Sequence, residues 1–571
     1  IAGASTDGYT AKSQAGWGLY AESGLIGFKT AVTRAFDQEV FDQLTASTST
    51  SSYLDTKSSY VDQIDQLVGS TSAGAALPTA LATFASDLET LASQPAVAAT
   101  RIEVVNSATV LAQTLNSLAA TASDIGAAVD GEIAEAVETI NTTTALISSL
   151  NAQIVSYEGQ GADATGLEDK RDQAVLQLSS LLDVQVKTQA DGSIRVSTTS
   201  GTTLVDNARA TQFEVDAAGA LRVADGSGRG ADAIATGMVA SGKIAALYEV
   251  RDTLLPQVQA QLDQAAAQLA SAMSDVTTAG TAVTSGAQAG QSIDIDDLEA
   301  GNTLSLTVAD TATGAERRYT FVKVTSAAAL PLADDAMLDP NDTVVGIDFS
   351  GGVASVAAQI QTALGASFTV SNPSGTTVRI LDDGAGGTTD VVGLTKTVTM
   401  TDTQSGNGAV ALFTDGTVAY TGSRDDGAQI DGLAARLRVN AEIAADPSLL
   451  VAYDATSEAS DTTRPDHLVV ALTEGEGWFT LGGGQAASRS TLASFANAMV
   501  SYWGANATTQ KTLVDNQSVI QTNLQSRMSD ISAVSTDDEL AKLIQLQTQY
   551  SANAQVLSTV RDMLDTLLGA F

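Results

Sequence analysis

Residues Asp537 to Phe571 read DDELAKLIQLQTQYSANAQVLSTVRDMLDTLLGAF, and the interpretation of the whole chain starts from them. The stretch contains no proline, and its first glycine is Gly569. Its apolar residues recur in steps of three and four once Gln547 fills one gap, which is typical of a helix that packs along one face against another helix. These residues, called the terminal seam below, are Leu543, Tyr550, Ala554, Leu557, Val560, Leu564, Leu567 and Phe571.

Two interpretations of the terminal seam are open. About 32 residues of helix would extend roughly 48 Å at 1.5 Å per residue, so the apolar face is long and needs a partner. In the first interpretation the helix docks on its own domain, which is the usual role of an amphipathic helix. In the second it is an assembly helix that packs against a terminal partner and against neighbouring subunits.

Composition places the chain among large soluble proteins with several cores. With 571 residues the chain is too long for one hydrophobic core, so three or four domains are expected. A hydrophobic share of 44% excludes wholesale disorder. Aromatic residues make up only 5%, so small and aliphatic side chains must fill the cores.

The charge balance excludes two classes of partner. Lys and Arg number 28 against 66 Asp and Glu, which gives a formal net charge of −38. Phosphate backbones and anionic membrane surfaces would repel such a chain, so neither nucleic acid nor a membrane is expected as a partner. The sequence also contains no apolar run of about 20 residues, the length that a membrane-spanning helix needs.

Candidate chemical sites are weak throughout the chain. There is no cysteine and only one histidine, His467, so thiol chemistry is excluded and histidine-based sites depend on one residue. The acidic run Asp294, Asp296 and Asp297 lacks the glycine and the twelfth-position acid of a calcium-binding loop. Gly384–Gly387 and Gly482–Gly484 lack the Lys-Ser or Lys-Thr of a phosphate-binding loop. We therefore expect no enzyme, no metal site and no cofactor.

Three charged residues of one helix have a structural interpretation. Asp169, Arg171 and Asp172 lie in the segment LEDKRDQ and could be imagined as an acid–base group. On an exposed helix face at this spacing, ion pairs that set a packing register are expected instead.

Periodicity orders the chain as helix, then β-structure, then helix. Helical spacing dominates 29–68 and 97–157, with a Ser/Thr-rich centre at 45–53 that marks a polar face or a bend. Asp191-Gly192 predicts a hairpin turn between alternating strands, and Pro256 predicts a kink. Between about Thr277 and Asp431, apolar alternation separated by Gly, Asp and Asn predicts strands, with one helix at Val353–Leu364.

These changes of pattern predict a multidomain α plus β fold: a coiled-coil-like bundle of long helices from both chain ends with a β-rich insertion in the middle. The segments are an irregular N-terminal segment or short strands (1–28), the first part of the helical bundle (29–183), a β-rich subdomain (184–242), the second part of the bundle (243–276), an outer β-rich α+β insertion (277–431), a return segment (432–488), the last part of the bundle (489–535) and a C-terminal assembly helix (536–571).

The terminal stretch resembles a known motif. Leu543-Ile544, Tyr550–Leu557 and Met563–Leu568 are similar to the C-terminal motif that rod, hook and hook-associated proteins of the bacterial flagellum share. The opening ASTDGYTAKS resembles the Asn-x-x-x-x-Gly-Tyr-Thr pattern that follows the first helix of these axial proteins. Gly8, Tyr9 and Thr10 match that pattern, but Gly3 stands where the Asn would be.

Internal motifs point to one family among the axial proteins. Leu167–Val186 (LEDKRDQAVLQLSSLLDVQV), preceded by Ile147–Ile154 (ISSLNAQI), is similar to a segment typical of the hook-associated proteins of the hook–filament junction. Leu437–Ala452 (LRVNAEIAADPSLLVA) resembles the segment that returns the chain of that family from its β domains. The resemblance covers both ends and the helical middle, and the insertion carries none of it.

The resemblance implies a structural role without catalysis or cofactors. It implies export through the flagellar type III channel without a cleaved signal peptide, and polymerisation outside the cell into a homo-oligomeric ring or helical layer at the hook tip. Hook protein, the second junction protein and a cytoplasmic export chaperone would be the partners. Members of the family begin with a long helix that is lacking before Ile1, so we expect the pairing of the two terminal helices to be incomplete.

Other functions stay open at this point. Flagellin and hook or rod proteins share the axial architecture, although flagellin has different terminal motifs and hook and rod proteins are mostly β-structure between their ends. An acidic S-layer or adhesin protein would fit the composition. Such a protein should gain order or assemble with calcium, whereas a junction protein should be indifferent to it.

Overall fold

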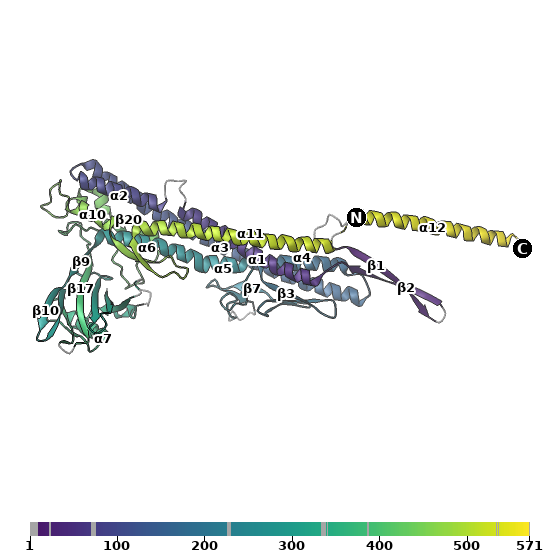
Figure 1. The fold of residues 1–571 in the computed structure, drawn as a ribbon, viewed down its shortest axis with the longest axis horizontal. Helices are drawn as coiled ribbons and strands as arrows, with labels where there is room; N and C mark the ends of the chain where they lie inside the picture. Colours follow the sequence, from purple (N-terminus) through teal and green to yellow (C-terminus); the bar gives the residue numbers. More distant parts are fainter. Residues whose placement is uncertain are drawn as a thin grey trace. The chain divides into compact units, whose positions relative to one another are not determined.

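The computed structural model describes residues 9–21, 24–69, 76–224, 230–332, 339, 341–384, 387–532, 534 and 536–569, without the side chains of 14–31, 536 and 538. Long helices alternate with β-sheets along the chain (Figure 1), which confirms the multidomain α plus β class. The chain forms two compact units. Unit 1 contains Ile1–Tyr60, Val129–Val250 and Thr509–Phe571, and unit 2 contains Val61–Ala128 and Arg251–Thr508.

Long helices dominate unit 1, and three of them are shared with unit 2. The helices of unit 1 are the first part of α1 (Gln38–Gly69), the second part of α3 (Ala98–Gly159), α4 (Thr165–Leu181), α5 (Lys243–Glu249), the second part of α11 (Leu492–Ser532) and α12 (Thr536–Leu568). α1 begins at Gln38 because Asp37 caps it. One oxygen of this carboxylate accepts the backbone N–H groups of Glu39 and Val40 at 3.0 and 3.2 Å.

The Ser/Thr-rich centre of α1 is a buried polar face and not a bend. The helix continues without interruption through it, and Thr45, Ser47, Ser49 and Ser51 are all buried. The Gln517 side-chain amide of α11 donates to the Ser47 carbonyl at 3.1 Å and to its hydroxyl at 2.9 Å. Short hydroxyl side chains therefore let α1 and α11 approach each other, and these helices come from opposite ends of the sequence as expected.

A β-hairpin is found where the sequence predicted an irregular segment or short strands. β1 (Lys12–Ala21) and β2 (Gly24–Arg34) pair antiparallel over their length, with one register shift near Leu19. The glycines argued correctly against a helix, but a two-stranded ladder tolerates them, because Gly16 and Gly18 pair with Thr30 and Phe28. Of the two alternatives for 1–28, the described residues form strands and not an irregular segment, and the helical region begins nine residues later than the predicted 29.

The second sheet of unit 1 follows the predicted hairpin. Its strands are β3 (Val184–Thr188), β4 (Ile194–Thr198), β5 (Thr203–Asp206) and β6 (Arg209–Ala210), hydrogen-bonded in that order, and β7 (Phe213–Val215) pairs with β8 (Leu221–Val223). Gly192 has a φ of +80°, which suits glycine in the turn between β3 and β4. The Asp191 carboxylate accepts the Ser193 N–H at 3.1 Å and the Ser193 hydroxyl at 2.6 Å, which closes the turn.

The helical body of unit 2 contains α2 (Leu77–Ser93), the first part of α3, the π-helical turn η1 (Val250–Leu254, whose first residue belongs to unit 1), α6 (Leu255–Ser274), α8 (Leu433–Arg436), α9 (Ala441–Ala445), the 3-10 turn η4 (Pro447–Leu450), α10 (Thr463–Thr473) and the first part of α11. Pro256, where a kink was predicted, lies in the first turn of α6, and the π-helical turn η1 ends two residues before it. Trp503 of α11 is completely buried, and its indole N–H donates to the Gln261 side-chain oxygen at 2.9 Å.

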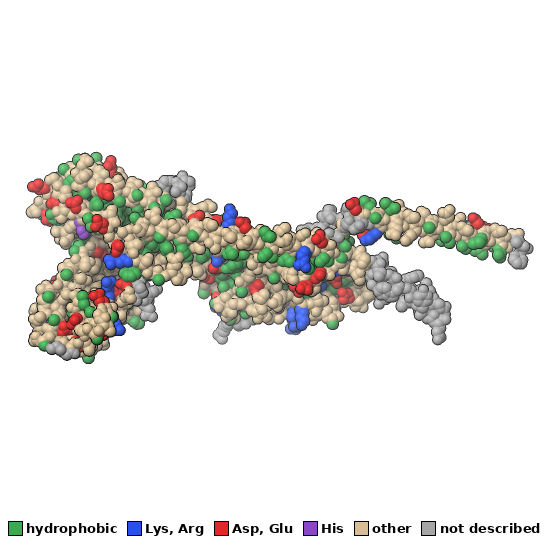
Figure 2. All heavy atoms as spheres, in the orientation of Figure 1, with side chains coloured by type: hydrophobic (Ala, Val, Ile, Leu, Met, Phe, Trp, Pro, Cys, Tyr) green, Lys and Arg blue, Asp and Glu red, His purple; other side chains and the backbone are tan. Residues whose placement is uncertain are grey.

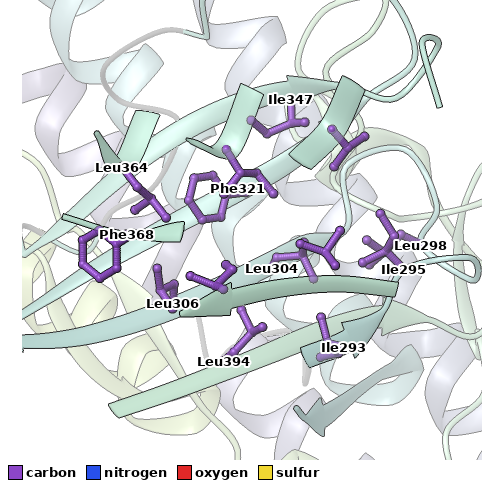
Figure 3. Packing of buried hydrophobic residues seen from close by; sticks show 14 of the residues in the cluster. Ile293, Ile295, Leu298, Leu304, Leu306, Phe321, Ile347, Leu364, Phe368 and Leu394 are labelled. Carbon is purple, nitrogen blue, oxygen red and sulfur yellow. The ribbon is translucent and has the colours of Figure 1, made fainter. Parts of the chain in front are cut away.

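The insertion is a compact α+β body in unit 2. One sheet has the strand order β14-β13-β12-β17-β9 and another has the order β10-β11-β16-β15. The elements are β9 (Asp275–Ala279), β10 (Thr281–Ser285), β11 (Gln288–Asp294), β12 (Thr303–Asp310), β13 (Glu316–Val324), the 3-10 turn η2 (Ala327–Ala329), β14 (Asp342–Asp348), α7 (Val353–Leu364), β15 (Thr369–Ser371), β16 (Thr377–Leu381) and β17 (Thr389–Thr399). Leu304, Leu306 and Phe321 lie in its core (Figure 3).

The β-rich body of the insertion ends earlier than the predicted residue 431. After Thr399 the chain runs into the helical body, where the run Ala409–Phe413 is buried. The Val410 N–H donates to the Met273 carbonyl of α6 at 2.8 Å, and the Phe413 ring meets Phe84 of α2 at 5.6 Å. The remaining strands are β18 (Phe413–Asp415), β19 (Val418–Ala419), β20 (Leu437–Val439), β21 (Glu476–Phe479) and β22 (Ser488–Thr491).

Candidate assembly surfaces

The terminal seam lies on α12 and is exposed. Five of its large side chains have exposed fractions between 42% for Leu543 and 78% for Tyr550, with Leu557 at 71%, Leu564 at 56% and Leu567 at 61%. Val560 and Ala554 are exposed as well, and Phe571 lies outside the described residues. Figure 2 shows apolar side chains along this helix. An apolar face of this length exposed to water is a surface suited to association.

The segment LEDKRDQ on α4 joins the base of the β1–β2 hairpin to the helices. Arg34, the last residue of β2, contacts three carboxylates: Nε lies 2.7 Å from Glu168, and NH1 lies 2.5 Å from Asp172 and 3.3 Å from Asp169. Asp169 also pairs with Lys12 at 2.9 Å. We call this group the hairpin-base cluster. Although burial disfavours its charge, the three carboxylates raise the pKa of Arg34.

The other side of the same helix holds the β3–β4 turn. Arg171 is buried, and its guanidinium donates to the Gly192 carbonyl at 2.8 Å and to the Asn151 side-chain oxygen at 3.2 Å. The Asn151 amide in turn donates to the Ile194 carbonyl at 2.8 Å. Burial lowers the pKa of Arg171. The motif thus has two polar faces, one for each hairpin.

The structure separates the three charged residues that the sequence grouped. Asp169 and Asp172 belong to the hairpin-base cluster, whereas Arg171 contacts carbonyl oxygens near the β3–β4 turn. The expected exposed face is wrong, because Asp169 and Arg171 are buried, but the two acids form ion pairs as expected. Their partners Lys12 and Arg34 could not be found from sequence, because more than 130 residues separate Arg34 from Asp169.

The return segment is fixed by two side chains of the helical body. Asp263 of α6 accepts the backbone N–H groups of Gly432 and Ala434 at 2.8 Å each, so it caps α8 from outside. Asn116 of α3 donates to the carbonyls of Ala434 at 2.7 Å and Leu437 at 3.2 Å. The motif LRVNAEIAADPSLLVA therefore begins at a point held from two helices.

The candidate chemical sites have structural partners. Asp294 accepts the Asp296 N–H at 3.0 Å, and Asp297 pairs with Lys396. Among the described residues, no group of three His, Asp or Glu side chains could hold a metal ion. His467 lies on α10, and burial together with the nearby Arg464 lowers its pKa. The buried Arg464 guanidinium donates to the carbonyls of Thr403 and Leu449 at 2.8 and 2.5 Å, which holds loops in place.

Comparison with known proteins finds two family models. Residues 61–293 match the model described as "Flagellar hook-associated protein FlgK helical domain". Residues 525–570, which include the whole of α12, match the model described as "Flagellar basal body rod FlgEFG protein C-terminal". Of the helices in the described part of the chain, none is long and apolar enough to cross a lipid bilayer.

Curated relatives carry one name. Flagellar hook-associated protein 1 of Escherichia coli (strain K12) is 24% identical over 570 residues, which cover 98% of this chain and 92% of that protein. Its counterpart in Salmonella typhimurium is 30% identical over 205 residues, 36% of each chain. A solved structure, the flagellar hook junction protein FlgK from Burkholderia pseudomallei, aligns with a TM-score of 0.40 at 16% identity, covering 84% of this chain and 99% of that one.

Proposed function

We propose that the chain is a member of the flagellar hook-associated protein 1 family, a structural axial protein that joins hook to filament. The exposed terminal seam carries the proposal. The apolar face of α12 is exposed in the described chain, and it can be buried against other helices in an assembled tube. A structural member of this family needs no catalytic group, and the polar clusters described above hold hairpins and loops.

We further propose the partners and the route of this chain. It would leave the cytoplasm with an export chaperone, pass through the flagellar type III channel without a cleaved signal, and polymerise at the hook tip as a ring or helical layer. Hook protein would contact one side of that layer and the second junction protein the other. The strong negative charge, −38 in total, keeps unassembled copies apart in solution until their seams are aligned.

The alternatives are less well supported. The relatives found carry the hook-associated name and none is a flagellin, an S-layer protein or an adhesin. The match of 525–570 to a rod-protein model reflects a terminal motif that axial proteins share. Titration with calcium, followed by light scattering, distinguishes the S-layer alternative: the scattering of a junction protein should not change.

Deletion of the gene tests the proposed function. Cells that lack this protein should carry hooks without filaments and should release filament monomer into the medium, because the monomer has no layer on which to polymerise. Electron microscopy of the cells shows whether hooks carry filaments, and electrophoresis of the culture medium detects released monomer. The wild-type gene on a plasmid is the control. Normal filaments on the deletion strain would refute the assignment.

A further inference from the structure

A row of charged side chains crosses the sheet β3-β4-β5-β6 of unit 1. The strand register places four residues in line across it, called the cation row below: Lys187, Arg195, Asp206 and Arg209. Residues that lie opposite each other on neighbouring antiparallel strands point to the same face of the sheet. Val196, the next residue of β4, is completely buried, so the cation row lies on the solvent face. Figure 2 shows Lys and Arg side chains on the surface beside β3.

The cation row holds together charges that repel each other. Lys187 lies directly opposite Arg195, and like charges in this position destabilise a sheet. Asp206, the one acid of the row, pairs with Arg195 at 2.9 Å. Hydrogen bonds from Arg195 and Gln189, together with the nearby charge of Arg209, lower the pKa of Asp206. Lys187 and Arg209 are exposed, and neither side chain forms a direct ion pair with a described residue. These two cations are therefore available to an external acid.

Such a row is exceptional on this strongly acidic chain. Residues 184–213 contain three cations and two acids, a net charge of +1, whereas the whole chain carries −38. Each copy of the chain therefore presents many acidic surfaces and few basic ones. A local basic surface attracts an acidic one on another copy, although the copies as wholes repel each other. A second copy is the occupant that the charge distribution favours.

A groove on α3 in unit 1 has the complementary charge. Its volume is about 410 Å³, and its walls include Ala134, Glu138 and Ala145 of α3 and Gln212, which precedes β7. Glu138 and Glu135, one helical turn apart, are both exposed, and neither side chain forms a direct ion pair with a described residue. The small side chains of Ala134 and Ala145 leave room for the long side chains of Lys and Arg.

The cation row and the α3 groove also match in length. The row crosses the three spacings between its four strands, about 14 Å at about 4.8 Å each. The groove from Ala134 to Ala145 follows about 16 Å of helix at 1.5 Å per residue. Another groove of unit 1, between α1 and α11, does not fit the row, because none of its lining residues is acidic and Arg527 is basic.

We propose that the cation row of one copy docks on the α3 groove of a second copy, with Lys187 and Arg209 against Glu135 and Glu138. This inference rests on the proposed function, because it assumes a layer of identical subunits. Row and groove lie on different elements of unit 1, so each copy can use both at once. Repetition of such a contact between two different surfaces generates a ring or a helical layer.

Disulfide trapping in the assembled layer tests the contact. The chain has no native cysteine, so introduced thiols are the only ones that it carries. Cells of the deletion strain express two full-length chains together, one with Ala208→Cys beside the row and a size-tagged one with Ala134→Cys in the groove. Hooks are then isolated and oxidised. Both positions are exposed, and neither substitution removes a charge. In the control, Ala152→Cys replaces Ala134→Cys, since Ala152 is exposed on α3 but lies roughly 27 Å farther along the helix.

We expect the yield of mixed disulfide to be several-fold higher with Ala134→Cys than with Ala152→Cys. Adding Arg209→Glu to the first chain should lower this yield several-fold. Adding Glu138→Arg to the second chain should then restore it, because the two charges are exchanged but still opposite. Circular dichroism checks that both charge variants fold.

Three results would overturn the proposal. Equal yields with Ala134→Cys and Ala152→Cys would show that the groove is not the contact, and so would a loss with Arg209→Glu that Glu138→Arg does not restore. Predominant pairing of two Ala208→Cys chains would replace the proposed contact by one of row against row. Attachment of a photo-crosslinker on the Ala208→Cys thiol to a different axial protein would replace the second copy by another partner.

The presence of the wild-type chain in isolated hooks is scored separately. If the chain is present and the cells carry filaments but no mixed disulfide forms, the contact between row and groove is refuted and the proposed function stands. Absence of the wild-type chain from isolated hooks would refute the proposed function itself.

Discussion

Replacing Arg34 by alanine should release the β1–β2 hairpin from α4. The substitution removes the guanidinium that contacts Glu168, Asp169 and Asp172, and leaves Lys12 as the cation that the cluster retains. The Arg34 side chain is 12% exposed and the three acids are 8–19% exposed, so water screens them little. Breaking a buried ion pair from one side costs about 3–5 kcal/mol, and the residual exposure places this case near about 3 kcal/mol.

The rates of hydrogen exchange at two backbone amides measure this loss of stability directly. The Ala11 N–H donates to the Ser532 carbonyl at 2.7 Å, and the Ala35 N–H donates to the Ala11 carbonyl at 2.8 Å, so both open when the hairpin base opens. A loss of about 3 kcal/mol corresponds to an opening constant raised about 100-fold, and exchange of both amides should accelerate by about that factor.

Two further variants separate charge from general damage. Arg195→Ala removes an exposed pair with Asp206, whose side chains are 51% and 41% exposed, so it should change neither the overall stability appreciably nor the exchange of these amides. Arg34→Lys keeps the charge but loses the forked contact, so its effect should be intermediate. If Arg34→Ala exchanges no faster than Arg195→Ala, the hairpin-base cluster does not hold the hairpin.

Two more predictions concern unit 2. Burial raises the pKa of Asp275 to about 6, against hydroxyl donors Thr399 and Ser274 that favour its ionised form, so the folded state binds this proton more tightly than the unfolded chain. Ionised Asp275 therefore lowers the free energy of unfolding above about pH 6. When the pH falls from about 7.5 to about 5, the free energy of unfolding of wild type, measured with urea, should rise by about 1 kcal/mol relative to that of Asp275→Asn. A difference between the two proteins that does not change with pH would contradict this. Asp263→Ala should lower the free energy of unfolding by about 1–2 kcal/mol and increase proteolysis near Gly432, because two backbone N–H groups lose their acceptor. A digestion pattern like that of wild type would refute the capping role.

Local periodicity predicted much of the helical framework. The helix expected at 97–157 is α3 at Ala98–Gly159, and the helix expected in the insertion is α7 at Val353–Leu364. The hairpin at Asp191-Gly192 also forms. These features depend on residues that are neighbours in sequence, since spacing of apolar side chains and turn residues decides them.

What the sequence could not predict depends on distant contacts. The β1–β2 hairpin contains Gly16, Gly18, Gly24 and Gly27, which argue against a helix but do not reveal the pairing of the strands. Its anchor Arg34 contacts acidic residues of α4, which is distant in the sequence. The end of the insertion was misplaced because Ala409–Phe413 looks like a strand of the insertion, whereas α2 and α6 cover it. The Asp37 cap was visible in the sequence and would have placed the start of α1 correctly.

The candidate assembly surface also has one feature that the sequence predicted and one that it could not predict. The period of the terminal seam was readable from sequence, because it lies within one helix. The contact between α1 and α11 was not, since Ser47 and Gln517 come from opposite ends of the chain and meet only in the fold.

Complementation of the deletion strain with two α12 variants tests the central claim most directly. Leu557→Asp places a charge on the seam, and Ser558→Asp places the same charge one residue away on the same exposed helix. The account predicts that cells with Leu557→Asp export the protein but carry hooks without filaments, whereas cells with Ser558→Asp swim on normal filaments. Normal filaments with Leu557→Asp would contradict the claim that this chain joins hook to filament through the seam.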